Sequence, residues 1–372
     1  MNNKLVKIFI VLLLFVIFLA LALMNSNLGK FDLAHDGSIL KYDFNNCQGL
    51  FETDNGNVFF CAKNCVKLLN SNGEEKWSQD SDFTSPVICH AKNFLGVSDI
   101  KTNSIHVFDS DGEKYNLKTE NNLLAFSVNE SGYCATISKD DASYKIDAYD
   151  KSANKFFTYV HSEENIFPVN VAISLDGKIL AISYVDTNNM NIDSKITFMH
   201  TDGDEIFASA SVKNNFVSGL NFLSNNDIII IGEDKIILGC LSRDKFQEKW
   251  HIDFETKINM VAFNKNFVAV HLLNKIAAQK KSTIKFYNMS GKNISNFESD
   301  QVFNCIKACD KFNCVLIISP DKFLAVNPSS KILWQYDAVG EQKFVAFLGR
   351  LNKILFASST KTYVVDVNNK GE

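Results

Sequence analysis

The chain has 372 residues, 46% of them hydrophobic, and a formal net charge of -4 at neutral pH. No long block of Lys or Arg stands out, so the composition excludes the usual electrostatic footprint of a nucleic-acid-binding protein. The 31 Phe and 10 Tyr, with only 4 Pro, favour packed β-structure over a disordered chain.

The N-terminal segment predicts a membrane anchor. Residues 1–7 include two lysines and are expected to stay cytoplasmic, which places the rest of the chain outside. Residues 8–24 are apolar throughout and, with the two residues before them, approach the ~20 residues that cross a bilayer as a helix. A cleaved signal peptide is the alternative, because Ala-Leu-Ala at 20–22 has the spacing of a cleavage site. That site lies inside the apolar run, which favours an uncleaved anchor.

A folded domain is predicted to follow this anchor closely. Residues 25–37 read as a short polar linker, and residues 38–372 as the domain itself. Ser38–Phe44 alternates between apolar and polar residues like a strand. Unlike the later strands, it is not joined to the strand that follows by a turn at the usual spacing.

One short unit recurs through the domain: a strand, a tight polar turn, and a second strand that ends on an aromatic residue. It is plainest at Leu68–Trp77 and Ala325–Trp334, and Cys240–Trp250 is a copy with one extra residue. In these three copies a polar residue lies seven positions before the Trp: Asn70, Arg243 and Asn327. Looser copies are Val107–Tyr115, Ala148–Phe157, Phe198–Phe207 and Phe286–Ile294. A unit that repeats about every 40 residues indicates an array of small sheets, because one such sheet cannot bury its own apolar face.

From Gly49 onward the chain divides into groups of four predicted strands. The first group is Leu50–Thr53, Asn57–Ala62, Val66–Leu69 and Lys76–Gln79, and later groups begin near Pro86, Leu123, Pro168, Phe216, Ile258, Val302 and Lys343. Asp-Gly and Asn-Gly turns between alternating runs are typical of hairpins. No long amphipathic helix pattern interrupts the groups.

The last group predicts how the array closes. It contains three strands, Lys343–Leu348, Lys353–Ser358 and Lys361–Val367, and Ser38–Phe44 is the spare strand that would complete it. A β-propeller closes its ring in this way and so removes an exposed sheet edge. We therefore predict an all-β propeller of four-stranded antiparallel blades. Eight blades are favoured, and seven is the alternative if two weak groups are divided wrongly.

The turn units resemble those of the PQQ-like (quinoprotein-type) β-propellers, whose repeats end in a turn followed by Trp. LLNSNGEEKW and AVNPSSKILW fit that pattern, and the resemblance extends from Ser38 to the C-terminus. With the anchor ahead of it, the chain looks like a membrane-anchored, uncharacterised branch of that superfamily. The resemblance implies a fold and no particular activity, because propellers carry many unrelated functions.

No catalytic, cofactor or metal site is predicted. Enzymes of the resembling family stack their quinone against two adjacent cysteines, and this chain has no Cys-Cys dipeptide. The seven His lack HxxxH or HxH spacing, and neither a G-x-S-x-G motif nor a Gly-rich phosphate loop occurs. We therefore expect a protein that is not an enzyme. A quinoprotein-like oxidoreductase or a hydrolase is the weaker alternative.

The nine cysteines leave two interpretations open. Cys61 and Cys65 flank one short turn, Cys309 and Cys314 flank another, and each pair could close a disulfide across a hairpin. The alternative is that Cys serves here as a small buried hydrophobic residue. An odd number leaves at least one thiol unpaired in either case.

Partner binding is predicted on one face of the ring, where blade-to-blade connections and the loops between second and third strands lie together. Two of these loops, Val185–Ser194 and the basic Asn274–Ser282, are predicted to be long. Long loops on a rigid scaffold commonly carry recognition. The candidate partner-binding residues are Asp186, Asn188, Asn189, Met190, Lys275, Lys280 and Lys281. The blade-to-blade connections are rich in Asp and Glu, either as a solvated rim or as an attraction for a basic partner.

These patterns together predict a membrane-tethered, extracytoplasmic propeller that acts as a non-enzymatic scaffold for a protein or cell-envelope partner. A small-molecule sensor that binds its ligand in the central channel is the alternative.

Overall fold

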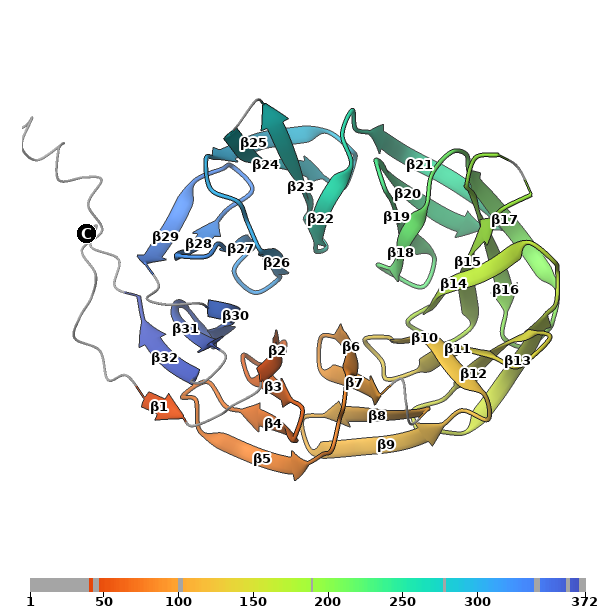
Figure 1. The fold of residues 1–372 in the computed structure, drawn as a ribbon, viewed down its shortest axis with the longest axis horizontal. Helices are drawn as coiled ribbons and strands as arrows, with labels where there is room; N and C mark the ends of the chain where they lie inside the picture. The colour runs from red at the N-terminus through yellow and green to blue at the C-terminus, as the bar shows by residue number, and fades with distance from the viewer. Residues whose placement is uncertain are drawn as a thin grey trace, which may run out of the picture.

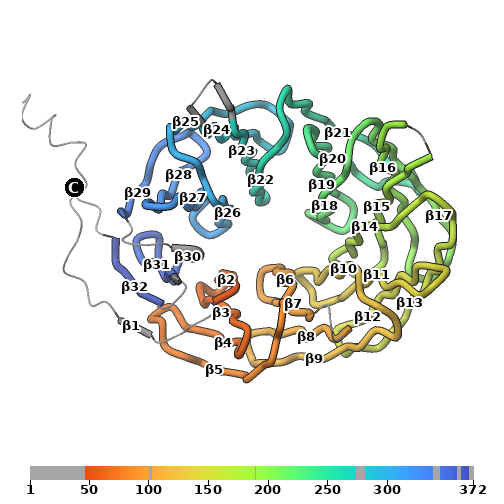
Figure 2. The backbone as a smooth tube through the Cα atoms, in the orientation of Figure 1, coloured from red at the N-terminus to blue at the C-terminus, as the bar shows by residue number. Residues whose placement is uncertain are grey.

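The computed structural model describes residues 40–42, 47–99, 103–188, 190–276, 279–337, 342–358 and 362–367. These residues form eight four-stranded antiparallel sheets, arranged as blades around a central channel (Figure 1). The backbone trace in Figure 2 shows one strand of each blade against the channel and the others stacked outward. The prediction of an eight-bladed all-β propeller is confirmed, and the seven-bladed alternative is wrong.

The strands of each blade follow one another in the chain, the first being innermost, except that blade 8 takes its outermost strand from the N-terminal side. Blade 1 consists of β2 (Cys47–Glu52), β3 (Val58–Ala62), β4 (Cys65–Leu69) and β5 (Glu75–Asp80), and blade 2 of β6 (Pro86–Ala91), β7 (Phe94–Asp99), β8 (Ser104–Asp109) and β9 (Gly112–Lys118). Blade 3 consists of β10 (Asn122–Val128), β11 (Cys134–Lys139), β12 (Tyr144–Tyr149) and β13 (Lys155–His161), and blade 4 of β14 (Ile166–Ile173), β15 (Ile179–Asp186), β16 (Asp193–His200) and β17 (Ile206–Val212). Blade 5 consists of β18 (Val217–Phe222), β19 (Asp227–Gly232), β20 (Lys235–Ser242) and β21 (Lys245–Asp253), and blade 6 of β22 (Ile258–Phe263), β23 (Phe267–Ile276), β24 (Gln279–Asn288) and β25 (Asn293–Ser299). Blade 7 consists of β26 (Cys305–Cys309), β27 (Cys314–Ile318), β28 (Lys322–Val326) and β29 (Ile332–Asp337), and blade 8 of β30 (Gln342–Leu348), β31 (Arg350–Ser358), β32 (Thr362–Asp366) and β1 (Leu40–Tyr42).

The ring closes through the strand that the sequence left over. β1 pairs antiparallel with β32, with Leu40 opposite Val364 and Tyr42 opposite Thr362. The predicted closing strand at 38–44 is therefore confirmed over its described part. The predicted N-terminus, anchor and linker (1–7, 8–24 and 25–37) lie outside the described residues. Within the described ranges, no helix has the length and apolar character needed to cross a membrane.

Burial follows the position of a strand within its blade. Every residue of β3 and β27, both second strands, is buried, because each blade packs its two faces against its neighbours. Such strands read as continuous apolar runs. The outermost strands β5 and β21 instead alternate between exposed and half-buried residues, because one part of each faces solvent.

A β-bulge accompanies the recurrent turn in blades 1 to 7. In each, the register between third and fourth strands shifts by one residue after the turn. In blade 5 the shift comes further from the turn, at Lys249. In blade 1, for example, Leu69 lies opposite Glu75 and Leu68 opposite Trp77, which leaves Lys76 unpaired. The extra residue turns the next side chain inward, between its own blade and the following one.

The bulge corrects two of the predicted repeats. In blades 4 and 6 the residues aligned with Trp77 are Ala208 and Ser295, not the Phe207 and Ile294 that end the predicted copies, because those two residues are bulged.

The predicted polar position before the Trp is also only partly right. The side-chain oxygens of Asn70 and Asn327 each accept two backbone N–H groups of their turns. In blade 5, Arg243 and Asp244 instead have φ of 51° and 57° and form the two centre positions of a tighter turn between Ser242 and Lys245. Arg243 therefore shares the seven-residue spacing from the Trp but not the turn structure found at Asn70 and Asn327.

In several blades the aromatic residue that follows the bulge contacts the next blade. The indole N–H groups of three tryptophans donate to backbone carbonyls of the following blade: Trp77 to Ser110 (3.1 Å), Trp250 to Met289 (2.9 Å) and Trp334 to Leu351 (2.6 Å). Tyr115 does the same through its hydroxyl, which donates to Gly132 at 2.8 Å. A large ring with one polar atom can thus fill the gap between blades and satisfy a turn carbonyl at once.

The two segments predicted as long loops are largely strands. β23 and β24 stay paired up to Ile276 and Gln279, so Asn274–Ser282 is the end of a long hairpin and the loop prediction is wrong there. β15 and β16 stay paired up to Asp186 and Asp193, which leaves only the tip of Val185–Ser194 outside the ladder.

All nine cysteines are free thiols, and six of them are buried. Cys309 and Cys314 lie directly opposite each other in the β26–β27 hairpin. The structure therefore matches the interpretation of Cys as a small core residue.

The tryptophan contacts predict a cost for removing one donor. Trp334 is fully buried, and Trp334→Phe should lower the free energy of unfolding by about 1–3 kcal/mol, because the Leu351 carbonyl loses its partner. Urea unfolding measures this, and Tyr336→Phe in the same core cluster is the control, because the Tyr336 hydroxyl has no hydrogen-bond partner among the described residues. Equal losses in the two variants would contradict the role of the indole N–H.

Ring closure predicts that the closing strand is essential. Deletion of residues 38–44 should leave the edge of β32 unpaired and produce aggregation or severe destabilisation. Size-exclusion chromatography and thermal melting of the deletion variant and the intact domain test this. A truncated protein that stayed monomeric with an unchanged melting temperature would contradict the closure.

Candidate functional site

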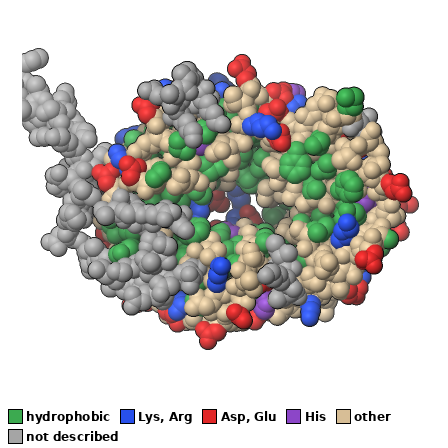
Figure 3. All heavy atoms as spheres, viewed as in Figure 1, with side chains coloured by type: hydrophobic (Ala, Val, Ile, Leu, Met, Phe, Trp, Pro, Cys, Tyr) green, Lys and Arg blue, Asp and Glu red, His purple; other side chains and the backbone are tan. Residues whose placement is uncertain are grey.

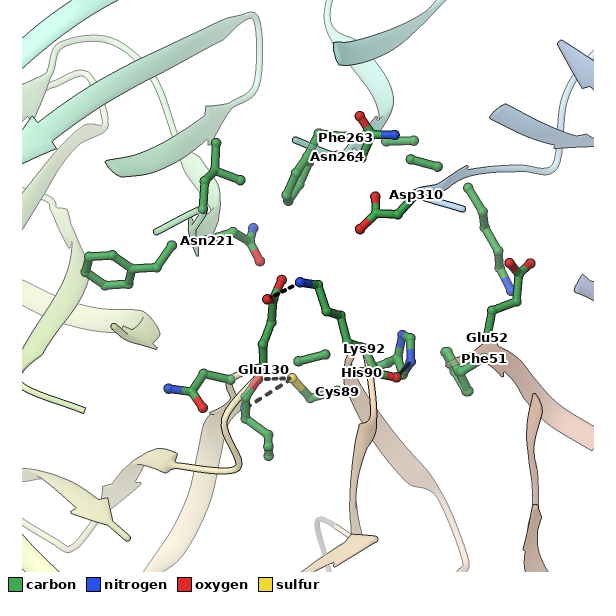
Figure 4. A pocket seen from close by; sticks show the side chains of 18 of the residues that line it. Phe51, Glu52, Cys89, His90, Lys92, Glu130, Asn221, Phe263, Asn264 and Asp310 are labelled. Carbon is green, nitrogen blue, oxygen red and sulfur yellow. Dashed lines mark hydrogen bonds and ion pairs between the residues drawn. The ribbon is translucent and has the colours of Figure 1, made fainter. Parts of the chain in front are cut away.

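The described residues enclose a cavity of about 770 Å³ at one end of the central channel (Figure 4). Its walls come from the ends of the first strands of blades 1 to 7 and from the turns that join these to the second strands. We call this region the channel mouth. Its charged residues are Glu52, Asp54, Lys92, Glu130, Lys265, Lys307, Asp310 and Lys311.

Seven of the eight charged residues lie at or just after the end of the first strand of blades 1, 2, 3, 6 and 7, and Lys307 lies within β26. In blades 3 and 6 these turns begin with Asn129 and Asn264, whose side-chain oxygens accept backbone N–H groups of the turn. Such residues favour tight turns. The next position is then free to project a charge, and Glu130 and Lys265 occupy it.

An ion pair between Lys92 and Glu130 joins the adjacent blades 2 and 3 at the channel mouth. Figure 4 shows it near the centre of the cavity. Partial burial by itself would lower the pKa of Lys92. The bond to Glu130 and the nearby charges of Glu130 and Asp54 outweigh that effect and raise this pKa. Lys92 therefore stays charged and bound to Glu130 at neutral pH.

Asp310 faces this ion pair from blade 7 (Figure 4). Partial desolvation raises the pKa of its carboxyl, and the positive charges of Lys92 and Lys265 only partly offset this because Asp54 and Glu130 add negative charge. Asp310 makes no ion pair within 4 Å and no side-chain hydrogen bond among the described residues.

Glu52 connects blade 1 with blades 7 and 8 at the channel wall. One carboxylate oxygen accepts the backbone N–H of Phe347 at 2.8 Å, and the other accepts the Cys309 thiol at 3.2 Å. The neighbouring Lys307 ammonium donates to the Leu50 carbonyl at 2.8 Å. Burial raises the pKa of Glu52, although these hydrogen bonds and Lys307 oppose the shift.

His90 adds no charge to the channel mouth at neutral pH. Burial lowers its pKa to about 4, so the ring is neutral, and its Nε2–H donates to the Lys92 carbonyl at 2.8 Å. The ring also packs against Phe51, with 5.3 Å between centroids.

The other side of the cavity is mostly apolar, with Asn221 of blade 5 as a polar residue whose amide lies toward the cavity (Figure 4). Blades 4 and 5 contribute Leu175, Leu220, Phe222 and Leu223, and blade 6 adds Phe263. The channel mouth is thus amphipathic, with its charges gathered on blades 1, 2, 3, 6 and 7. Pockets of this size and mixed lining are typical of small-molecule sites.

The predicted partner-binding residues lie at the opposite end of the propeller, because successive hairpins of a blade point to opposite faces. Asp186 accepts the backbone and side-chain N–H groups of Asn188, and Met190 is fully exposed at the tip of the β15–β16 hairpin. Asn189 lies outside the described residues. We call this end of the ring the hairpin face.

The basic residues of the prediction lie on the β23–β24 hairpin of the same face. Lys275 pairs with Lys280 across the ladder, and nothing is described of their side chains. Lys281 forms an ion pair with Glu298 at 2.5 Å. The two hairpins belong to blades 4 and 6, with blade 5 between them, so the structure places the two predicted groups on one face without bringing them into contact (Figure 1).

Exposed apolar side chains mark the hairpin face on blade 4. Besides Met190, Ile192 is 52% exposed and Phe167, at the start of β14, is 40% exposed. Figure 3 views this face and shows hydrophobic side chains on the right of the ring, with acidic and basic groups visible at the far end of the channel.

Part of the acidic rim of the hairpin face is neutralised locally. Glu120 pairs with Lys145 at 2.6 Å, Asp253 with Lys235 at 2.9 Å, and Glu298 with Lys281. This favours the solvated-rim interpretation over a strong attraction for basic partners.

Sequence reasoning did not single out the channel mouth. The available signal was positional: aligning the ends of the first strands shows charged residues where other blades have Ser, Leu or Gly. Among the described residues, no group of three or more His, Cys, Asp or Glu side chains is placed to hold a metal ion.

The Glu52 contacts predict a pH-dependent stability difference. Because burial raises the pKa of Glu52 in the folded state, the protonated carboxyl stabilises the fold at low pH, and this is lost as the pH rises through the raised pKa. Glu52→Gln stays neutral, so its stability relative to the wild type should increase as the pH rises above the ordinary pKa of a Glu carboxyl. Urea unfolding at a series of pH values measures the difference, with exposed Glu164→Gln as control. A pH-independent difference would contradict the raised pKa.

Comparisons with known proteins concern the fold. No curated protein sequence matches the chain. The crystal structure of BamB from Moraxella catarrhalis is similar, with a TM-score of 0.53 and 9% identity over 88% of this chain and 98% of that one. Kuenenia stuttgartiensis hydrazine synthase gives a TM-score of 0.46 and 11% identity over 91% of this chain and 99% of that one. The likeness to BamB concerns the fold alone. The sequence pattern of DUF5711, a family of unknown function, matches residues 46–367, and the chain belongs to that family.

Proposed function

We propose that this propeller is a non-enzymatic scaffold, tethered to the outer face of a cell membrane, that binds a protein partner through its hairpin face. The observation that carries the proposal is the exposure of Met190, Ile192 and Phe167 together on blade 4. Large apolar side chains grouped on an otherwise polar surface mark interaction sites.

The hairpin tip has the properties of a binding element. The β15–β16 ladder continues up to Asp186 and Asp193 and so fixes the base of the tip. Met190 is unbranched and polarizable, and such side chains adapt to irregular partner surfaces. The partner would present an apolar pocket to this tip and acidic groups to the basic β23–β24 hairpin.

The tether follows from the apolar run at residues 8–24. The linker at 25–37 has thirteen residues and, fully extended, reaches at most about 45 Å. The chain enters the propeller at β1, the outermost strand of blade 8. The scaffold would therefore hold its partner close to the membrane surface.

The partner surface is tested with paired variants of the full-length protein. Met190→Asp with Ile192→Asp should abolish in-cell crosslinking to a partner that the wild type captures stoichiometrically, because charges at the tip cannot enter an apolar pocket. Ile206→Asp with Ile294→Asp is the matched control, since these residues are 44% and 42% exposed and lie at the opposite end of the ring.

The outcomes separate the alternatives. Loss of one defined partner in the tip variant alone, with unchanged melting temperature, supports the hairpin face. Equal capture by both variants places the partner elsewhere. Protease added to intact spheroplasts tests the tether: digestion of the propeller supports an outward-facing domain, and protection contradicts it.

A further inference from the structure

We propose that the packed seam between blades 6 and 7 opens in acid, through protonation of His271. The seam is the buried surface where β22 to β25 meet β26 to β28, and the two blades lie side by side in Figure 1. The proposal is independent of the partner on the hairpin face and of the membrane tether.

His271 lies inside this seam. The residue is in β23 and is fully buried. It faces the same way as Phe267 and Ala269, because alternate residues of a strand share a face. Its ring packs against Phe303, in the connection from blade 6 to blade 7, with 5.3 Å between the ring centroids. Phe267, Ala269 and Phe303 form one apolar cluster with residues of blade 7, such as Ile317.

The hydrogen bonds of the ring suit its neutral form. Asn259 Nδ2 donates to Nδ1 of His271 at 3.0 Å, so the ring proton is on Nε2. Nε2 is buried and has no hydrogen-bond partner in the described part of the chain. A second proton, on Nδ1, would break the bond from Asn259 unless that amide turned over.

No charged group compensates a protonated ring at this place. The described titratable side chains of β22 to β28 and of the connection after β25 are Lys281, Lys285, Tyr287, Glu298, Asp300, Cys305, Lys307, Cys309, Cys314 and Lys322. None of them contributes to the pKa of His271, which burial alone lowers from 6.5 to about 4. A buried charge without a partner is costly, so the packed seam excludes the proton.

Comparison of the blades singles out this seam. In blades 1, 3, 4, 5, 6 and 8 a bulge interrupts the pairing of the first strand with the second, and the residue after the bulge marks one equivalent position on the second strand. In chain order that position holds Cys61, Ile137, Ser183, Ile231, His271 and Ala357. Among these six described blades, only blade 6 has a histidine there.

Closure of the seam and protonation of His271 therefore compete. A hydrated histidine has a pKa of 6.5 and gains a proton below that pH, whereas the packed ring stays neutral down to about pH 4. The stability of the closed seam is complete above pH 6.5 and falls as the pH drops toward 4, with a change of about tenfold in the opening equilibrium per pH unit. Between pH 8 and pH 5, His271 by itself should favour opening about thirtyfold.

Hydrogen exchange of the full-length protein measures this opening, with rates corrected for the intrinsic pH dependence of amide exchange. From pH 8 to pH 5, the protection of peptides from β23, β26 and β27 should fall about thirtyfold more than that of peptides from β11 and β15, which flank the seam between blades 3 and 4. His271→Gln and His271→Phe cannot take up the proton, so in both variants this difference should disappear. Using two variants separates the missing proton from any packing defect of either side chain.

His251→Gln is the control, because His251 is exposed on β21 and its replacement should leave the acid response of the seam in place. A selective loss of protection that both His271 variants abolish and His251→Gln preserves supports the proposal. The proposal is overturned if acid reduces protection equally in both seams, if it leaves the seam between blades 6 and 7 protected, or if His271→Gln retains the wild-type response.

Discussion

The packing of each blade against the next is the constraint on which this structure depends. A four-stranded blade has two apolar faces and can bury them only against its neighbours, so no blade is stable alone. The indole groups of Trp77, Trp250 and Trp334 show how the chain meets this requirement, because each fills an inter-blade gap and binds a carbonyl of the following blade. Ring closure through β1 extends the same packing to the last blade.

The two ends of the ring have different chemistry because they are built from different turns. The first-to-second-strand turns converge on the channel, so their side chains form a shared, partly desolvated cavity. The hairpins of the opposite face diverge outward, and the tips of blades 4 and 6 remain separate. Convergent turns favour a small ligand, and a projecting apolar tip favours a macromolecular partner. One propeller can therefore combine a ligand site with a protein-binding surface.

Much of the fold could be predicted because the repeat is local. Strand, Asn-capped turn and aromatic residue lie within about ten residues of one another, and the hydrophobic period of each strand reports its burial. The errors also have local causes. Phe207 and Ile294 were aligned one position early because a bulge is invisible in the sequence pattern, and the polar run at Asn274–Ser282 was read as a loop although its strands simply extend beyond the blade.

The sequence by itself determined the blade architecture, the blade count and the closing strand, since each depends on residues adjacent in the chain or on a strand missing from the last group. Only the tertiary structure decided which side chains meet. Lys92, Glu130 and Asp310 belong to three blades and are separated by long stretches of sequence, yet they share one cavity. Their proximity, and the desolvation that raises the pKa of Asp310, arise from the closed ring, which brings the ends of seven first strands to one opening.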